Sequence, residues 1–400
     1  MLKKLHTPLG VVFTTLLIDK LGENIIYPLL PFILAAYKPD ALTLGVVASV
    51  GTLFAVLTGP VVGSLSDSLG RRTMVLICIG LNTISLLMFG WAGSLLMVLI
   101  SRSIFGIGSS TMGTLQAYIT DISDSKNRAR NLGISGAAFG LGAIAGPALG
   151  GGLIGLGVKV PIFVAAGLSG YNLLAAFLFL RESIPPEKKK PPRWSSLNIV
   201  RPIKRILTQP VVNRVALAFA CFNLAFAAFT SLLVLALKDQ FGWTPAQTSG
   251  LFVVVGVTLT YAQVALIGRF VGLLGEFRLN RVGMILVSTG IMFIPLATIA
   301  GAFETTIIIL AGIILALGAA FVLPTARSLI AGLVPSDQQG VTLGSLASLT
   351  GLASAIGPIA AGWVYDRSTL ACFAMEASAC LIGVALLGQT PKAVPNQAES

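Results

Sequence analysis

Long runs without a charged residue restrict how this chain can fold more than any other feature of its sequence. Of the 400 residues only 10% are charged, whereas a soluble domain carries about a quarter. A helix needs about 20 apolar residues to cross a hydrocarbon layer of ~30 Å, and the uncharged runs reach that length. They include 41–66, 131–158, 160–180, 215–237, 240–268, 282–303 and 338–365. We therefore predict an all-α integral membrane protein.

Twelve transmembrane helices account for these runs. The stretch between Arg72 and Arg102 is too long for one helix and is interrupted at residues 90–94, so it is predicted to form a hairpin. The predicted helices are 9–36, 42–66, 73–91, 95–119, 132–156, 160–180, 211–237, 247–268, 281–301, 305–333, 340–365 and 369–388. The four cysteines inside them show no metal or redox spacing, so neither a metal nor another cofactor is expected.

The distribution of Lys and Arg predicts the orientation of the helices. With both termini inside, 20 of the 27 basic residues lie in cytoplasmic tails and loops, four lie in external loops, and Lys20, Arg102 and Arg327 lie within spans. This asymmetry follows the positive-inside rule. The net charge of +12 is therefore attributed to topology and to contact with anionic lipids, with no role for nucleic acid. We expect a multi-pass monomer in the cell membrane, cytoplasmic or inner.

A polar segment near mid-chain, 181–210, separates an N-terminal six-helix bundle (1–180) from a C-terminal bundle with a short tail (211–400). Its second part, 195–208, mixes apolar with basic residues and is predicted to lie along the inner membrane face. This division places the joint between the sixth and seventh predicted helices.

The two halves look like repeats of one another. Seven positions of the fifth helix recur 211 residues later in the eleventh: Leu132, Gly133, Gly140, Leu141, Gly146, Pro147 and Gly151. A second echo pairs Gly63 and Gly70 with Gly268 and Gly275 at an offset of 205 residues. Parallel six-helix repeats are one architecture of secondary transporters, which predicts two pseudo-symmetric six-helix bundles.

The loop predicted after the second helix contains Gly63, Asp67, Gly70, Arg71 and Arg72. Glycine permits a tight turn, and Asp67 lies within reach of the two arginines. An ordinary hairpin with positive-inside arginines would show the same residues. The pattern nevertheless resembles the signature loop of the major facilitator superfamily, G-x-x-x-D-x-x-G-R-R/K. In that family the loop latches the two halves together on the cytoplasmic side, which implies a gate here.

The fifth predicted helix contains Gly140, Gly146, Pro147, Gly150 and Gly151. Proline bends a helix and glycine lets neighbouring backbones approach closely. Simple helix packing would explain these residues as well. Their spacing resembles the motif that marks the antiporter branch of the superfamily, and it serves as a structural marker under either interpretation.

Residues 117–152 and 339–358 resemble the tetracycline/proton antiporters closely, and the likeness covers all twelve helices. Asp121 lies in the first of these stretches, and we expect Asp67, Arg71 and Asp121 to form a charge cluster that closes only in the outward-facing state. Tetracycline exporters carry acids within helices 3 and 9. Here helix 3 has Asn82 and Ser85 and helix 9 has no acid, so tetracycline is not the expected substrate.

Polar residues inside the first predicted helix are candidate proton-coupling groups. Asp19, Lys20, Glu23 and Asn24 lie near mid-membrane, where a charge usually faces a cavity or a partner. Lys20 can reach Glu23 one turn along, and a pair that only holds the helix in place is the alternative. Asp19 matches the helix-1 acid of the family's D-x-x-G…P-x-x-P pattern. We predict that Asp19 titrates and that Glu23 stays ionised beside Lys20.

Arg102 and Gln116 of the fourth predicted helix complete the candidate cavity. The family often places an arginine at the position of Arg102, which makes it a candidate for proton relay or for holding an anionic group; a snorkelling arginine is the alternative. Glu376 of the twelfth helix has no partner evident by sequence and is assigned no role. His6, the only histidine, lies in the tail, so any titrating switch is expected to be a carboxyl group.

These features favour a proton-driven exporter of small amphipathic molecules that works by alternating access. A uniporter or proton symporter for a metabolite, nucleoside or peptide-like solute is the alternative, and the direction of flux under an imposed proton gradient separates the two. An enzyme is disfavoured because the chain lacks a nucleophile elbow, a zinc-binding HExxH motif and a Walker loop, so no catalytic residue is expected. The expected partners are the substrate, protons and lipids.

Overall fold

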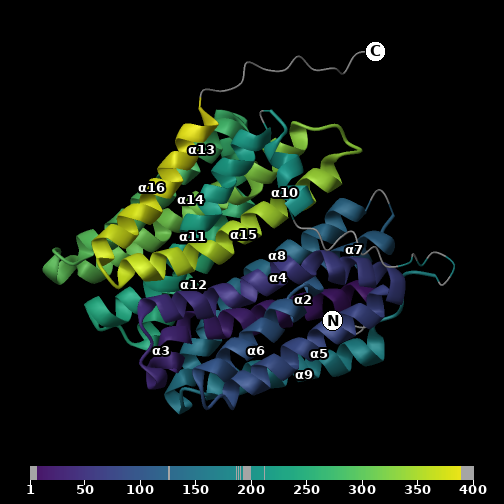
Figure 1. The fold of residues 1–400 in the computed structure, drawn as a ribbon, viewed down its shortest axis with the longest axis horizontal. Coiled ribbons are helices and arrows are strands. Elements are labelled where there is room, and N and C mark those ends of the chain that lie inside the picture. The colour runs from purple at the N-terminus through teal and green to yellow at the C-terminus, as the bar shows by residue number, and fades with distance from the viewer. Residues whose placement is uncertain are drawn as a thin grey trace. The chain divides into compact units, whose positions relative to one another are not determined.

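The computed structural model describes residues 7–124, 127–185, 187, 189, 191, 200–210 and 212–388. Every regular element within these ranges is a helix (Figure 1), which confirms the all-α prediction. His6, the start of the predicted amphipathic segment at 195–199 and the C-terminal end of the chain lie outside the described residues.

Ten helical segments of the described chain are long and apolar enough to cross a membrane. One of them, Pro245–Ala297, has 53 residues and is therefore about 80 Å long as a helix, which is enough for two crossings. The first helix adds another crossing but is less apolar, because it carries Asp19, Lys20 and Glu23. Together these segments make up the twelve predicted crossings.

Residue contacts divide the chain into two compact units, one made of Met1–Ile199 with Ser231–Val257 and the other of Val200–Thr230 with Thr258–Ser400. The units thus differ from the bundles expected from the sequence, because the C-terminal part of α11 (Val212–Phe241) and most of α12 (Pro245–Tyr261) are grouped with the first. The division at 181–210 stays a prediction.

The first part of the chain forms helices up to Phe179. They are α2 (Pro8–Ile26), η1 (Tyr27–Leu29), α3 (Leu30–Leu34), η2 (Ala35–Tyr37), α4 (Ala41–Leu69), α5 (Arg71–Gly90), α6 (Leu95–Gly108), α7 (Thr111–Asp121), α8 (Arg128–Leu153), η3 (Ile154–Leu156) and α9 (Val160–Phe179). α2 begins after Thr7, whose side chain accepts a hydrogen bond from the backbone of Gly10. Pro28 and Pro31 break this first crossing into short 3₁₀ and α turns.

The second part begins with a short helix, α10 (Val200–Leu207), and continues as long spans. These are α11 (Val212–Phe241), α12 (Pro245–Tyr261), the π-helical η6 (Ala262–Leu266), α13 (Ile267–Ala297), η7 (Gly301–Phe303), α14 (Glu304–Gly332), α15 (Gln339–Tyr365) and α16 (Thr369–Leu387). α13 packs against α14 and α16. Gly283 and Gly318 face each other across the α13–α14 contact, where an added Cβ on Gly283 would lie 2.8 Å from the Gly318 carbonyl oxygen.

The prediction of loops at 67–72 and 269–280 is wrong. Both stretches are helical and are interrupted at one glycine each. α4 ends at Leu69 and α5 begins at Arg71, with Gly70 at φ 111° and ψ 150° between them. The helical stretch Ile267–Ala297 likewise turns at Gly275, at φ 74° and ψ 157°. One residue suffices at each turn because glycine alone adopts this backbone region readily.

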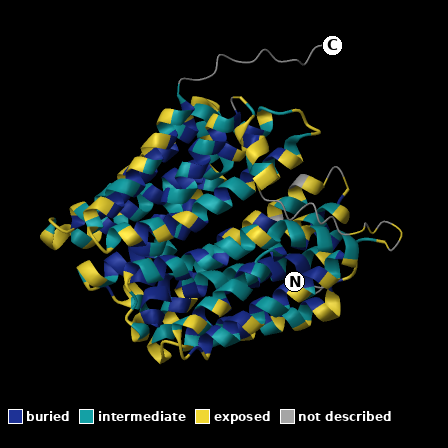
Figure 2. Cartoon of the chain, in the orientation of Figure 1, coloured by how far each residue is buried: buried dark blue, intermediate teal, exposed yellow. Residues whose placement is uncertain are grey.

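Apolar side chains fill the helix contacts and also cover the outside. In the first unit Val12, Leu16, Ile79 and Tyr118 are at most 2% exposed and belong to one core cluster. On α9, in contrast, large apolar side chains such as Leu178 stay exposed, at 61%, and exposed positions recur along the helices in Figure 2. Exposed apolar faces of this extent suit contact with lipid.

Candidate functional site

The turn at Gly70 is covered by an acidic side chain from the segment after α9. Glu182 occupies the space that a Cβ on Gly70 would need. Its Oε1 accepts hydrogen bonds from the backbone nitrogens of Arg71 at 2.8 Å and of Ser183 at 3.0 Å. The carboxylate therefore caps the first turn of α5, where free N–H groups favour a negative charge.

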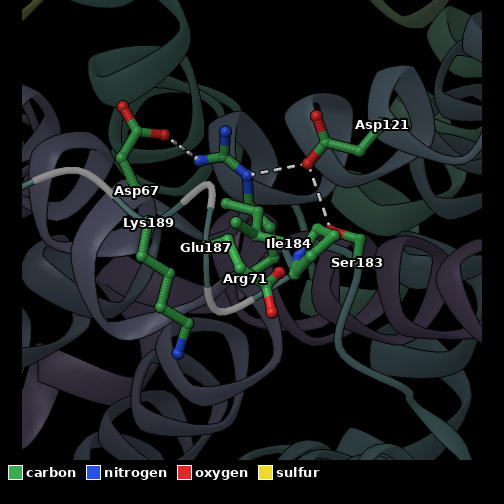
Figure 3. A pocket seen from close by; sticks show the side chains of 8 residues that line it. Asp67, Arg71, Asp121, Ser183, Ile184, Glu187 and Lys189 are labelled. Atoms are coloured by element: carbon green, nitrogen blue, oxygen red, sulfur yellow. Dashed lines mark hydrogen bonds and ion pairs between the residues drawn. The ribbon is translucent and has the colours of Figure 1, made fainter.

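Arg71 lies between two acids beside this turn (Figure 3). Its Nη1 is 2.7 Å from Oδ1 of Asp67 on α4, and its Nε is 3.1 Å from Oδ2 of Asp121 at the end of α7. The same Oδ2 accepts a hydrogen bond from the Ser183 hydroxyl at 3.1 Å. We call Asp67, Arg71, Asp121, Glu182 and Ser183 the Gly70 cluster. It ties α4, α5 and α7 to the segment that follows α9.

A pocket of about 660 Å³ opens beside this cluster. Its lining includes the three side chains of the ion-pair network and residues of the segment after α9, namely Asp67, Arg71, Asp121, Ser183, Ile184, Pro185, Glu187 and Lys189. The arginine side chain is only 13% exposed, whereas Asp67 is 48% exposed and Asp121 is 30% exposed. The central cation is thus much better shielded from water than its partners, which strengthens its interactions with them.

The structure brings four of the expected gate residues together, Asp67, Gly70, Arg71 and Asp121, and leaves two apart. Arg72 donates from Nη2 to the carbonyl oxygen of Phe177 at 2.8 Å, and its guanidinium lies 5.5 Å from the ring centroid of the same residue. Gly63 is exposed on α4, with nothing within 4 Å of the position of an added Cβ.

Sequence reasoning missed the contribution of the segment after α9. We interpreted 181–210 as a joint whose second part lies along the membrane, yet Glu182 and Ser183 of its first part bind the turn and Lys189 donates from Nζ to the Leu69 carbonyl oxygen at 2.8 Å. The available signal was an acid directly after the sixth helix, on the same predicted membrane side as Gly70. Its partner lies more than 100 residues away, so spacing could not identify it.

The polar stretch of α2 directs its two acids to different partners. Glu23 accepts a 2.6 Å ion-pair hydrogen bond from Nζ of Lys20. Asp19 instead accepts from Nδ2 of Asn82 on α5 at 3.3 Å. The side-chain Oδ1 of Asn82 is buried with no hydrogen-bond partner among the described residues. One acid is thus balanced by a cation, while the other faces a neutral amide.

Glycines of α8 bring that helix against this polar stretch. An added Cβ on Gly142 would lie 2.6 Å from Cβ of Lys20, and one on Gly146 would lie 2.5 Å from Cβ of Asn24. Asn24 itself donates from Nδ2 to the Lys20 carbonyl oxygen at 2.8 Å. The close approach that glycine permits therefore fixes the backbone around the charged residues.

The remaining residues of the predicted antiporter motif have separate contacts on α8. An added Cβ on Gly150 would lie 2.5 Å from the Ile25 carbonyl oxygen, and one on Gly151 would lie 2.5 Å from Cβ of Ser249. Gly140 and Pro147 are buried within the same helix. These contacts give the motif a packing role along much of the helix.

Arg102 and Gln116 do not join the acids of α2 through an ion pair in the part of the chain that the structure describes. The Arg102 guanidinium lies 4.8 Å from the ring centroid of Phe105, and its buried Nε has no hydrogen-bond partner among the described residues. Gln116 is exposed on α7. No group of three or more His, Cys, Asp or Glu among the described residues could hold a metal ion.

Comparison with known proteins identifies the family of this chain. The family model described as Major Facilitator Superfamily matches residues 12–303 and 278–400. The chain is 29% identical to the tetracycline resistance protein, class C, of Escherichia coli, with 91% of each chain covered. It is 30% identical to the class G protein of Vibrio anguillarum, with 88% of each covered. Multidrug resistance protein 2 of Bacillus subtilis is 24% identical, over 94% of this chain and 93% of that protein.

Solved structures show the same fold. The human organic anion transporter MFSD10 matches with a TM-score of 0.73 and 24% identity, over 95% of this chain and 98% of that chain. A transporter of the POT family reaches a TM-score of 0.78 at 14% identity, over 95% of each chain. The family model, which covers most of the chain, shows that this multi-pass membrane protein belongs to the major facilitator superfamily and is a transporter, not an enzyme.

Proposed function

We propose that this transporter exports small amphipathic molecules in exchange for protons, by alternating access. The observation that carries the proposal is the division of the two acids of α2: Glu23 forms an ion pair with Lys20 at 2.6 Å, whereas no ion pair of the described residues includes Asp19, which accepts a hydrogen bond from the amide of Asn82 at 3.3 Å. A carboxyl group that faces a neutral partner can gain and lose a proton without stranding a buried cation. The resistance relatives support export.

Asp19 is the proton-coupling group in this proposal. Its protonation exchanges a charged group for a neutral one inside α2, and the resulting change favours a different packing of the helices around it. Glu23 and Lys20 remain a permanent ion pair. The α8 glycines hold the backbone of this stretch close to α8, so a change at Asp19 is transmitted to a packed helix pair rather than absorbed by a loose one.

The Gly70 cluster acts as the cytoplasmic gate, with both termini on the cytoplasmic side. Arg71 bonds acids from two other helices and follows a turn that Glu182 caps, so the cluster links the ends of α4, α5 and α7. Such a cluster stabilises one conformational state by the interactions that it makes only there. We infer that this state is the outward-facing one.

The proton gradient is a sufficient energy source. Moving one charge through 100 mV supplies about 2.3 kcal/mol, enough for a roughly 50-fold concentration gradient of an uncharged substrate. The tetracycline exporters carry an acid within helix 3, whereas this chain has Asn82 and Ser85 there, and this difference favours an amphipathic substrate other than tetracycline.

Proton-driven flux into inside-out vesicles tests the proposal, with ethidium and tetracycline as the probes. We expect ethidium to accumulate when the vesicle interior is acidic and tetracycline to accumulate weakly. Asp19→Asn should abolish accumulation but retain exchange of ethidium down its own gradient. Glu23→Gln should reduce the folded yield, because it strands Lys20 in the membrane.

A single pattern of results would overturn this assignment. If Asp19→Asn still accumulates ethidium while Glu23→Gln folds normally and loses accumulation, the coupling acid is Glu23. Flux of the wild-type protein in the direction of the imposed proton gradient would contradict export and indicate a symporter.

A further inference from the structure

Glu376 is a buried acid that the proposed mechanism does not use. It is the eighth residue of α16 (Thr369–Leu387) and is 0% exposed. The buried face of α16 around it is otherwise apolar or small, and includes Phe373, Ala377 and Gly383. A carboxyl group at such a depth in a membrane helix is rare unless it has a function.

The carboxyl group has one weak partner. Its Oε1 accepts from the Cys372 thiol at 3.5 Å, while Oε2 is buried without a hydrogen-bond partner among the described residues. No ion pair of the described chain includes it. The titratable groups near it are thiols: Cys372 and Cys380, each one turn away on α16, and Cys221 of α11, which interacts with Cys380.

Three helices pack against α16 around this residue and contribute no charge at its level. On α13, the Ser288 hydroxyl donates to the Ala377 carbonyl oxygen at 3.1 Å. On α15, which has no acidic or basic residue, the Ala361 carbonyl oxygen accepts from Cys372 at 3.4 Å. On α11, the ring of Phe229 packs against that of Phe373, one turn from Glu376, with the ring centroids 5.9 Å apart. Together with the 0% exposure of Glu376, these contacts leave the carboxyl group shielded from water.

An ionised Glu376 would have neither water nor a counter-charge in this packing. Removing both is costly for a carboxylate, so the arrangement is compatible only with a neutral acid that carries its proton on the otherwise unbonded Oε2. The carboxylate becomes stable only if α16 separates from its neighbours and water reaches the group. Proton occupancy and helix packing are therefore linked, and each biases the other.

We propose that Glu376 is a second proton-binding site of the transport cycle, occupied while α16 is packed against α11, α13 and α15 and vacated when that packing opens. It lies in the second unit, whereas Asp19 lies in the first. The inference rests on the proposed proton coupling and adds to it a second carboxyl group with its own proton.

The ratio of protons to ethidium moved by the purified full-length protein in liposomes tests this site. We expect Glu376→Gln to lower the ratio by about half, because one of two proton-binding carboxyl groups is lost, and Glu376→Asp to retain it. Cys380→Ala is the matched control, since it alters the same buried face one turn away without touching the carboxyl group, and it should leave the ratio unchanged.

Labelling of the wild-type protein provides a test that needs no variant. Dicyclohexylcarbodiimide adds to a protonated carboxyl group in apolar surroundings, and mass spectrometry of the peptide containing Glu376 measures the product. We expect labelling to fall at least twofold at alkaline pH and to change when ethidium is present. Labelling that is independent of both pH and ethidium overturns the site.

The outcomes separate the inference from the function on which it rests. A wild-type protein that moves ethidium without protons overturns both. A wild-type protein that couples the two fluxes, with the same ratio in Glu376→Gln, overturns the second site alone and leaves Asp19 as the coupling group.

Discussion

The turns at Gly70 and Gly275 share a backbone conformation and differ in charge. They lie 205 residues apart, each between two long helices, with φ/ψ of 111°/150° and 74°/157°. At the first turn Glu182 fills the space beside the glycine, and Arg71 binds two acids. At the second nothing lies within 4 Å of an added Cβ.

The residue after each glycine shows the same contrast. Arg71 follows Gly70, whereas Glu276 follows Gly275 and accepts a hydrogen bond from the Ser328 hydroxyl of α14 at 2.6 Å. Both residues thus reach from a turn to a neighbouring helix, one through ion pairs and the other through a single hydrogen bond. The repeat preserves the turn, because helix geometry requires glycine there, while among the described residues an ion-pair network is found only at the first of the two turns.

Alanine at the two glycines should give the largest difference. Each substitution places alanine in a backbone region that only glycine adopts readily, which lowers the stability by about 1–3 kcal/mol. Gly70→Ala also displaces the Glu182 carboxylate and strands its hydrogen-bond donors, which adds about 1–3 kcal/mol. Thermal unfolding in detergent and ethidium transport should therefore both suffer more in Gly70→Ala than in Gly275→Ala.

Removing the Glu182 carboxylate should abolish the difference in stability between the two alanine variants. We expect Glu182→Ala by itself to lower the stability. In the Glu182→Ala background, Gly70→Ala and Gly275→Ala should then lower the stability by nearly the same amount. Equal losses in the two single variants would show that Glu182 does not distinguish the turns.

Neutralising the residue after each glycine should have the next largest effect. Arg71→Gln leaves Asp67 and Asp121 without their cation and should shift the conformational equilibrium by about 1 kcal/mol. Glu276→Gln keeps an acceptor for Ser328 and should change little. Transport rates in vesicles measure the effect, with expression level and ethidium affinity as controls. Asp67→Asn should likewise impair transport while leaving affinity intact. Wild-type rates in Arg71→Gln would remove the cluster from the mechanism.

Building an ion pair at the second turn should give a smaller effect. Glu276→Arg alone introduces a cation without a partner, and adding Ser328→Asp supplies one across the same helix contact. An exposed pair of this kind contributes about 0.2–1 kcal/mol. A double-mutant cycle on the thermal unfolding free energy should show favourable coupling of that size, and zero coupling would mean that the second turn does not have the geometry of the first.

The smallest effect concerns the opposite end of α4. Hydrogen bonds from Thr43, including its backbone nitrogen at 2.8 Å, hold the pKa of Asp40 below its usual value. The resulting stability is present above the ordinary pKa of an aspartate and is lost as the pH falls through the lowered value. Asp40→Asn remains a good N-cap, so it should unfold like the wild-type protein at neutral pH and lack part of its acid destabilisation. Transport should be unchanged at neutral pH, because this end of the helix is remote from Gly70.

The sequence by itself determined the structural class of this protein and the spacing of its membrane-spanning helices and turns. A membrane-spanning helix needs a long apolar run, and a sharp turn between two such helices needs glycine, so the twelve crossings and the pairing of Gly70 with Gly275 can be predicted from local constraints. The exact ends of the helices at these turns could not be predicted from the sequence, because the few polar residues there are acceptable both in a loop and at the end of a helix.

Only the tertiary structure decided which side chains meet. Glu182 beside Gly70, Asn82 beside Asp19 and the isolation of Glu376 all depend on helices that lie far apart in the chain. A one-dimensional pattern gives the face on which a residue lies but not the residue opposite it. Since the cost of a buried charge depends on that opposite residue, the roles of the acids follow from packing rather than from spacing.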